Sequence, residues 1–276
     1  MKWLKTLALS AALVGLLTGS SIASEVISDL DVVNTPTVVG LGVAMVPDYV
    51  GSNDYTVVPL PFLKYTFKGS ERYIKLAGPE LSINLLDNKN FFFGPLVRYY
   101  GSRDDDVDDD VVSKMDKIKS GANAGAFITY EYKEADPRNK IKVTLKAYGD
   151  VSGEYDGYLV DFDATYWSKV ADRWDAFIGV GTTFADKNYM DTYFSVNSSN
   201  RGSAPVAELP DYDADSNAMR DVYAQIGTLY YYEKNWLFGG AFRYSALLSD
   251  AKDSPVTDLR GDSNQYAVAL FAGYRW

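Results

Sequence analysis

Two neighbouring segments of the chain carry charged residues at alternate positions, and these residues are the ones best placed to act together. They are Lys140, Lys142 and Lys146 in "KIKVTLKAYGD", and Asp161 and Asp163 in "YLVDFDATYW". Alternate side chains of a β-strand point to opposite faces, so each charged set lies on one face and apolar residues occupy the other. On adjacent strands these charges would face one another, with Glu131 on the preceding strand, and facing charges can pair. The pattern predicts a charge ladder on the inner face of a sheet.

The absence of two residue types restricts the chemistry of the chain. It contains no histidine and no cysteine, so a Ser-His-Asp triad, a histidine metal site and a cysteine nucleophile are impossible. A glycosidase with paired carboxylates remains formally possible, but nothing singles out one pair among the 37 acidic residues. We therefore predict a protein that is not an enzyme, with no catalytic residue, no cofactor and no metal site.

Two acidic segments have some features of cation sites. "RDDDVDDD", from Arg103 to Asp110, could hold Ca²⁺ or Mg²⁺ near lipopolysaccharide, but a solvated, self-repelling loop is the favoured interpretation. "DYDADS" resembles the start of a calcium loop, yet Ser216 and Val222 occupy the places where an EF-hand needs Gly and Glu. The formal net charge of −10 gives no basic face for binding nucleic acid.

The N-terminal residues have the features of a secretory signal peptide. Lys2 and Lys5 precede an apolar run over residues 7–17, and small residues lead to a predicted cleavage between Ala23 and Ser24. A membrane anchor is the alternative, but the run is about half of the ~20 residues that a spanning helix needs. We predict a signal peptide over residues 1–23 and one exported domain over residues 24–276.

The exported part reads as a series of alternating strands. Twelve are predicted, at 36–45, 57–67, 72–77, 80–86, 90–100, 121–132, 140–149, 158–167, 174–184, 221–231, 236–246 and 265–276. Short connections alternate with long ones, which hold residues 101–120, 185–220 and 247–264. The strands of a soluble β-sandwich also alternate apolar and polar residues, but its short and long loops need not fall on opposite ends. The pattern favours an all-β fold, a transmembrane antiparallel up-and-down β-barrel in the Gram-negative outer membrane, with an even strand number.

The chain ends on an aromatic residue without a polar tail. In "YAVALFAGYRW" apolar residues recur at every second position, including Val268, Leu270, Tyr274 and Trp276. They form the lipid face of a closing strand, and the ending resembles the C-terminal signal that the barrel-assembly machinery reads. The predicted partners are therefore this machinery, membrane lipid and lipopolysaccharide. The inward charges indicate a filled or narrow lumen, although a twelve-stranded barrel can leave a small channel.

Three blocks together resemble the MipA/OmpV family, which is named after an MltA-interacting protein. The first is "PDYVGSNDYTVVPLPFLKY", with Pro47, Tyr49, Gly51 and Ser52 in a loop. The others are "DTYFSV" followed by "LPDYDADS", and the C-terminal stretch from Leu247 to Trp276. The chain departs from the family pattern in its Asp-rich loop and in a short 72–86 region. The four loop residues can equally serve turn chemistry.

The resemblance implies an outer-membrane barrel that acts as a scaffold between a lytic murein transglycosylase and a murein synthase. The family has no established catalytic residues to carry over. A narrow porin for small solutes and a surface adhesin that uses the long loops are the alternatives. Murein lies in the periplasm, where the barrel would offer only short turns and residues 24–35, and this counts against the scaffold.

Overall fold

Alternating burial along each strand shows how the sequence builds a closed wall. In the first strand, Val39, Leu41, Val43 and Met45 are exposed, whereas the residues between them face inward. The computed structural model describes residues 37–276, and most of its strands follow this two-residue period. A wall with an apolar outer face and a polar inner face suits a protein whose solvent is the lipid bilayer.

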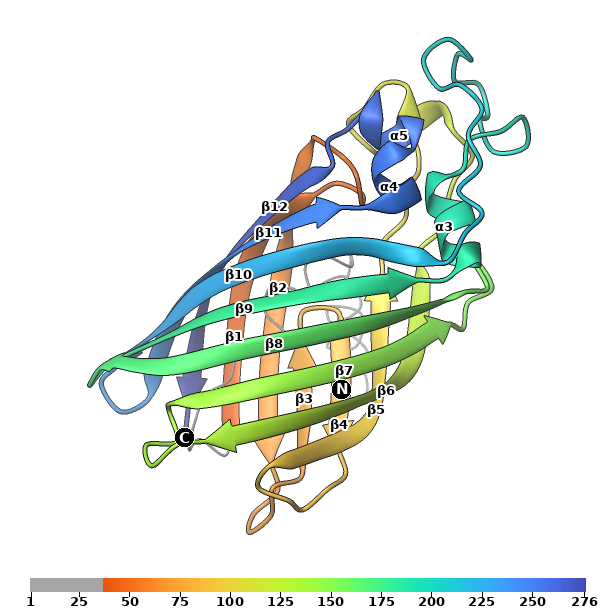
Figure 1. Ribbon diagram of the computed structural model, residues 1–276. Coiled ribbons are helices and arrows are strands. Elements are labelled where there is room, and N and C mark those ends of the chain that lie inside the picture. The colour runs from red at the N-terminus through yellow and green to blue at the C-terminus, as the bar shows by residue number, and fades with distance from the viewer. Residues whose placement is uncertain (1–36) are drawn as a thin grey trace, which may run out of the picture.

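Twelve antiparallel strands close into one barrel (Figure 1). Their bounds are β1 Thr37–Pro47, β2 Tyr55–Thr66, β3 Tyr73–Ala77, β4 Glu80–Asn84, β5 Phe91–Tyr100, β6 Gly121–Lys133, β7 Lys140–Asp150, β8 Tyr158–Ala171, β9 Trp174–Ala185, β10 Ala218–Tyr232, β11 Trp236–Leu247 and β12 Asn264–Arg275. Each strand pairs with its neighbour in sequence, and β12 returns to pair with β1, where Leu270 lies opposite Val43. The predicted fold is confirmed, including the division of the 72–86 region into two strands.

The connections sort onto the two ends of the barrel, except for the tight turn at residues 78–79 between β3 and β4, which lies beside the middle of β2. The end that we call the turn rim consists of residues 67–72, 85–90, 134–139, 172–173 and 233–235. The other end, the loop cap, consists of residues 48–54, 101–120, 151–157, 186–217 and 248–263. The cap contains a short 3-10 helix, Val112–Lys114, and the helices α3 (Lys187–Phe194), α4 (Ser249–Asp253) and α5 (Pro255–Asp258). In Figure 1 these three α-helices gather at one end, and the C-terminus lies at the other. No helix in the described part of the chain has the length and apolar character to cross a membrane.

Aromatic side chains border the apolar belt at both ends. Beside the turn rim, the ring centroids of Phe91 and Tyr130 are 4.9 Å apart, and those of Trp236 and Tyr274 are 5.3 Å apart. Beside the loop cap, the ring centroids of Tyr244 and Tyr266 are 5.5 Å apart. Such girdles place amphipathic rings at the two membrane interfaces.

Inside the barrel, large rings lie across glycines of the neighbouring strand. Phe177 is opposite Gly227, and a Cβ on that glycine would be 2.3 Å from the ring. Phe271 is opposite Gly239, where the corresponding approach would be 2.1 Å. These glycines are needed for close approach, because any side chain would occupy the volume that the ring fills.

Candidate functional site

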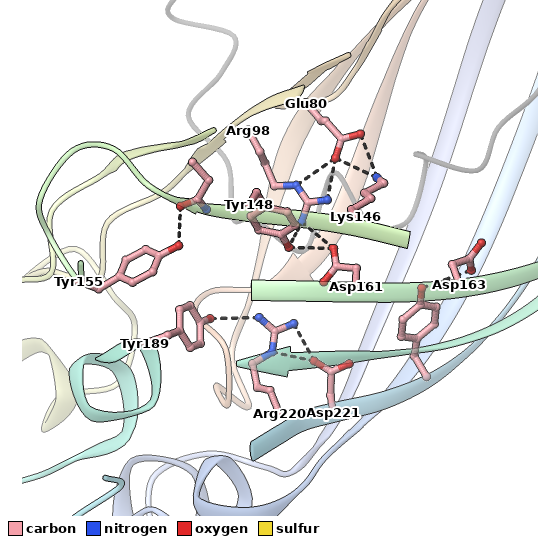
Figure 2. A network of polar contacts seen from close by, with 12 residues as sticks. Glu80, Arg98, Lys146, Tyr148, Tyr155, Asp161, Asp163, Tyr189, Arg220 and Asp221 are labelled. Atoms are coloured by element: carbon pink, nitrogen blue, oxygen red, sulfur yellow. Dashed lines mark hydrogen bonds and ion pairs between the residues drawn. The ribbon is translucent and has the colours of Figure 1, made fainter. Parts of the chain in front are cut away.

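Five side chains from four strands, four of them buried and Lys146 partly buried, form one ionic network in the half of the lumen nearest the loop cap (Figure 2). They are Glu80 of β4, Arg98 of β5, Lys146 and Tyr148 of β7, and Asp161 of β8. We call this set the Arg98 network.

Arg98 holds the centre of this network. Its Nη2 is 2.6 Å from Glu80 Oε2, and its Nη1 is 3.3 Å from Asp161 Oδ2. Lys146 Nζ donates to both Glu80 oxygens at 2.9 Å. The Tyr148 hydroxyl accepts from Arg98 at 2.5 Å and donates to Asp161 at 2.8 Å. Two cations thus meet two carboxylates, so the buried charge of this group is balanced.

A β-bulge builds a second ion pair near the loop cap. Consecutive strand residues normally face opposite sides, but the pairing of β9 with β10 shifts between Met219 and Asp221. Arg220 and Asp221 are consequently both buried, and Arg220 Nη2 lies 2.6 Å from Asp221 Oδ2. Arg220 Nη1 also donates to the Tyr189 hydroxyl of α3 at 3.1 Å (Figure 2). The pair therefore ties the barrel wall to the loop cap.

Tyrosines of the loop cap lie above these two groups. The Tyr189 and Tyr193 rings are stacked at 4.4 Å, and Tyr155 meets Tyr189 edge-on at 5.2 Å. Tyr155 donates to Asn123 Oδ1 of β6 at 2.5 Å. The pocket between these tyrosines, Arg98 and Arg220 has space for about one water molecule. In this conformation it does not accommodate a larger ligand.

The structure places the predicted charge ladder inside the barrel but gives it different partners. Lys146 lies opposite Asp161 in register, yet it forms its ion pair with Glu80. Asp161 forms an ion pair with Arg98 instead. Lys140 Nζ lies 3.9 Å from Glu131 Oε2 on the preceding strand. The alternation left the individual pairs of the ladder open, and in the structure Lys146 binds Glu80 rather than Asp161, which lies opposite it.

The remaining ladder residues also face inward. Lys142 is buried opposite Glu131 and Thr165. Asp163 accepts hydrogen bonds from Thr165, at 3.0 Å, and from Tyr223, at 3.3 Å.

Glu80 and Arg98 were missed by the sequence reasoning. A signal for Arg98 was present, because it falls on the inward positions of "FFFGPLVRYY" with Phe92, Gly94 and Leu96. The same signal marked Glu80, which begins a strand of five residues and shares its inward face with Ser82 and Asn84.

The turn rim is held together by hydrogen bonds from one turn to the next. Arg138 Nε donates to Asp175 Oδ1 at 2.6 Å, and its Nη atoms donate to the Asp172 and Trp174 carbonyls at 2.9 and 3.1 Å. Elsewhere, the Glu71 N–H donates to Asp87 at 2.9 Å. Such cross-links make the rim an ordered surface rather than a set of independent turns.

The Asp-rich loop is folded into the loop cap. Val107, Val111 and Val112 pack with residues of the other cap loops into a separate apolar cluster, in which Leu209 and Val256 are fully buried. The expectation of a solvated, self-repelling loop therefore fails for this part of it, because the apolar residues between the aspartates anchor the loop.

Asp109 shows how the acidic residues are accommodated. Arg260 Nη2 lies 2.8 Å from Asp109 Oδ2, and Asp109 Oδ1 accepts from the Val112 N–H at 2.7 Å. Burial by itself would raise the pKa of Asp109, but the hydrogen bonds from Val112 and Arg260 outweigh it and lower that pKa. Among residues 37–276, no three His, Cys, Asp or Glu side chains come together in a way that could hold a metal ion.

Comparison with known proteins assigns the lineage. The family model described as MltA-interacting protein MipA matches residues 39–276, which is nearly the whole described barrel. The chain belongs to the MipA family. No curated protein sequence matches it significantly.

Solved structures resemble this MipA-family chain in fold. The translocator domain of the autotransporter NalP from Neisseria meningitidis is 10% identical, with a TM-score of 0.50, and the match covers 99% of this chain and 98% of that one. Outer-membrane expressed OmpT of Vibrio cholerae is 9% identical, with a TM-score of 0.39, over 87% of this chain and 97% of that one. At such identities the likeness concerns the fold alone. The apolar belt and the family match support an outer-membrane barrel, and the likeness to the NalP translocator domain agrees with this fold.

The MipA-family loop motif cross-links the loop cap to the barrel wall. Pro47 ends β1, and Tyr49 is buried in the cap cluster. The Gly51 N–H donates to Gln265 Oε1 at 3.1 Å, and Gln265 Nε2 donates to the Ser52 carbonyl at 2.9 Å. These four residues therefore have a structural role, in which β12 and the β1–β2 loop are tied together.

Gly51 provides a test of this anchoring. Its φ is +99°, and an added Cβ would lie 2.5 Å from Thr257 Oγ1. We expect Gly51→Ala to destabilise the loop cap by about 1–2 kcal/mol through backbone strain alone, and by more through the clash. Limited proteolysis should cleave the cap faster. Gly69→Ala is the matched control, since Gly69 has φ +73° in the turn rim but open space around its Cβ position. Equal cap proteolysis in both variants would contradict the anchoring role.

The C-terminal strand of this MipA-family barrel has the predicted orientation. Leu270, Tyr274 and Trp276 are exposed on the outer face, and Val268 on the same face is half-buried. The Trp276 N–H donates to the Thr37 carbonyl at 3.2 Å, so the closure extends to the last residue. Recognition of these residues by the assembly machinery stays a prediction. The predicted cleavage site, Ala23 and Ser24, and the signal peptide lie outside the described residues.

Proposed function

We propose that this chain is a non-enzymatic interaction protein of the outer membrane that binds a murein-processing enzyme and serves envelope maintenance. The observation that carries the proposal is the family match over residues 39–276, because the family is described as MltA-interacting. The lytic murein transglycosylase is the first partner to test, and a murein synthase is the second.

The interior of the barrel is compatible with a role that involves no catalysis. The acids of the Arg98 network are neutralised by Arg98 and Lys146, and Asp221 by Arg220. A general acid or base needs a proton-transferring group within reach of a substrate. These carboxylates are instead buried in structural ion pairs beneath the loop cap.

The turn rim is the surface that we assign to the partner. In outer-membrane barrels the short turns face the periplasm and the long loops face outward. The cross-links made by Arg138 and Asp87 order the rim in advance, which reduces the entropy lost on docking. Contacts with membrane lipid, lipopolysaccharide and the barrel-assembly machinery belong to the same proposal.

Charge reversal at either end of the barrel tests this assignment. The rim variant combines Lys68→Glu, Lys89→Glu and Lys234→Glu, all exposed residues of turns. The matched cap variant combines Lys114→Glu, Lys119→Glu and Lys252→Glu, which are exposed residues of the loop cap. Detergent-solubilised protein on an affinity column should retain the transglycosylase. We expect the rim variant to retain roughly tenfold less, as a loss of about 1.4 kcal/mol of binding would give, and the cap variant to retain as much as the parent.

Three other results would count against the proposal. If only the cap variant lost retention, the partner would bind the loop cap and not the turn rim. Retention of no murein enzyme by the parent protein would refute the scaffold, and reproducible single-channel steps in a planar bilayer would then favour a narrow porin. Hydrolysis of peptidoglycan or lipid by the purified protein would refute its non-enzymatic character.

A further inference from the structure

One buried arginine of the loop cap has an unusual environment. Arg103 lies three residues after the end of β5, and its backbone forms an isolated bridge with Ile118 across the 101–120 loop. The residue is 4% exposed. Its Nη1 donates to the Tyr193 carbonyl at the end of α3 at 2.7 Å, so the guanidinium lies between two loops of the cap.

The guanidinium has no acidic partner among the described residues. Arg98, Arg201 and Arg220 are also buried, and each forms an ion pair with a carboxylate. The Nε of Arg103, by contrast, is buried without a hydrogen-bond partner. Burial lowers the pKa of Arg103, and only the tyrosines Tyr49, Tyr193 and Tyr189 act against that shift. Because arginine stays protonated in proteins, a positive charge is buried here without compensation.

A second donor without a partner lies near this charge. Tyr49 is buried in the loop cap, and its hydroxyl makes no hydrogen bond of good geometry, although Ser52 is near it. Burial raises the pKa of Tyr49, so the hydroxyl keeps its proton and can donate it. Tyr49, Arg103 and Tyr193 belong to three different loops. Two unsatisfied donors at a junction of three folded loops are costly unless something accepts from them.

We propose that Arg103 anchors an oxyanion site in the loop cap, which takes a phosphate group. The planar guanidinium matches two phosphate oxygens at once, and the Tyr49 hydroxyl can donate to the group as well. Acidic residues outnumber basic ones in the cap and repel anions at long range, so the site selects a small group that reaches the guanidinium itself. The group can be free phosphate or a phosphate borne by lipopolysaccharide, which surrounds the loops of an outer-membrane barrel. This inference is independent of any murein partner.

Protease protection of the cap in the folded, detergent-solubilised barrel tests the site. Inorganic phosphate, titrated at constant ionic strength, should slow cleavage of the cap at least tenfold at saturation, since binding to the folded state alone stabilises it. Arg103→Met should abolish this protection, and Tyr49→Phe should reduce it several-fold. Arg103→Met without phosphate should be cleaved no faster than the parent, because it removes an uncompensated charge.

Arg201→Met is the matched control, because Arg201 is a buried cap arginine with a carboxylate partner, Asp211. It should be cleaved faster than the parent in buffer, yet be protected by phosphate by the same factor. The site is refuted if phosphate fails to protect the parent, or if it protects Arg103→Met equally. Faster cleavage of Arg103→Met in buffer, at the rate of Arg201→Met, would assign Arg103 a structural role instead.

The source of the phosphate group is resolved with two further probes. Purified lipopolysaccharide and the same material after phosphatase treatment should be compared with inorganic phosphate. The site would be assigned to the lipid if intact lipopolysaccharide protected the cap at far lower concentration than the free ion, and if dephosphorylation abolished this protection. Protection by the free ion alone would assign it to inorganic phosphate. Protection by dephosphorylated lipopolysaccharide in Arg103→Met would contradict the site.

Discussion

Replacing Arg98 with leucine is expected to lower the free energy of unfolding of the barrel by about 3–5 kcal/mol, the usual cost of removing one partner from a buried ion pair. Glu80 would keep Lys146, but Asp161 would lose its cationic contact and the Tyr148 hydroxyl would lose a donor. Urea unfolding of the refolded barrel in detergent, followed by the gel migration of unheated samples, measures the change.

The adjacent residue provides the control for this prediction. Val97 is 48% exposed on the outer face, where lipid accepts another apolar side chain. Val97→Leu should change the free energy of unfolding by no more than about 0.5 kcal/mol. If both substitutions had the same effect, the assigned faces of β5 would be wrong, because a shift of one residue in register exchanges inner and outer positions.

Deleting β12 should prevent barrel formation altogether. This strand pairs with both β1 and β11, and its loss leaves two open edges whose unpaired backbone groups each cost several kcal/mol in lipid. Neither refolding into detergent nor expression in cells should yield a species whose migration changes on heating. Normal yield of such a species would refute the closure between Thr37 and Trp276.

A point substitution separates closure from recognition. Trp276→Ala keeps the backbone bond to Thr37, so we expect it to refold in detergent like the parent. Its insertion in cells should be impaired if, as we propose, the assembly machinery reads the terminal aromatic residue there. Trp276→Phe should restore insertion. Equal insertion of the alanine variant would show that the aromatic ending is not a signal.

The strands were predictable because a two-residue period is a local property of the sequence. The β7 segment was predicted at 140–149 and spans Lys140–Asp150. The period also placed Lys146 and Asp161 on the inner face. It could not identify Glu80 as the partner of Lys146, because that contact depends on how the barrel closes across strands far apart in sequence.

The irregular parts were not predictable because they, too, depend on contacts between segments that lie far apart in the sequence. The bulge after Met219 brings Arg220 inside beside Asp221, although alternation assigns neighbours to opposite faces. Composition suggested that the aspartates around Val107 form a solvated loop. The apolar cluster that holds this loop joins it to Leu209 and Val256, and no local pattern reports contacts over such separations.

With the loop cap outward, as proposed above, its shared core has a consequence for how the protein is recognised from outside the cell. Because Tyr49, Val111, Leu209 and Val256 come from four different loops and pack together, the outer surface is displayed as one folded unit. Antibodies raised against the native barrel should therefore bind epitopes assembled from several loops. They should lose binding to the boiled chain or to peptides of single loops. An immunogen based on any one of these loops would present a shape that the living cell does not show.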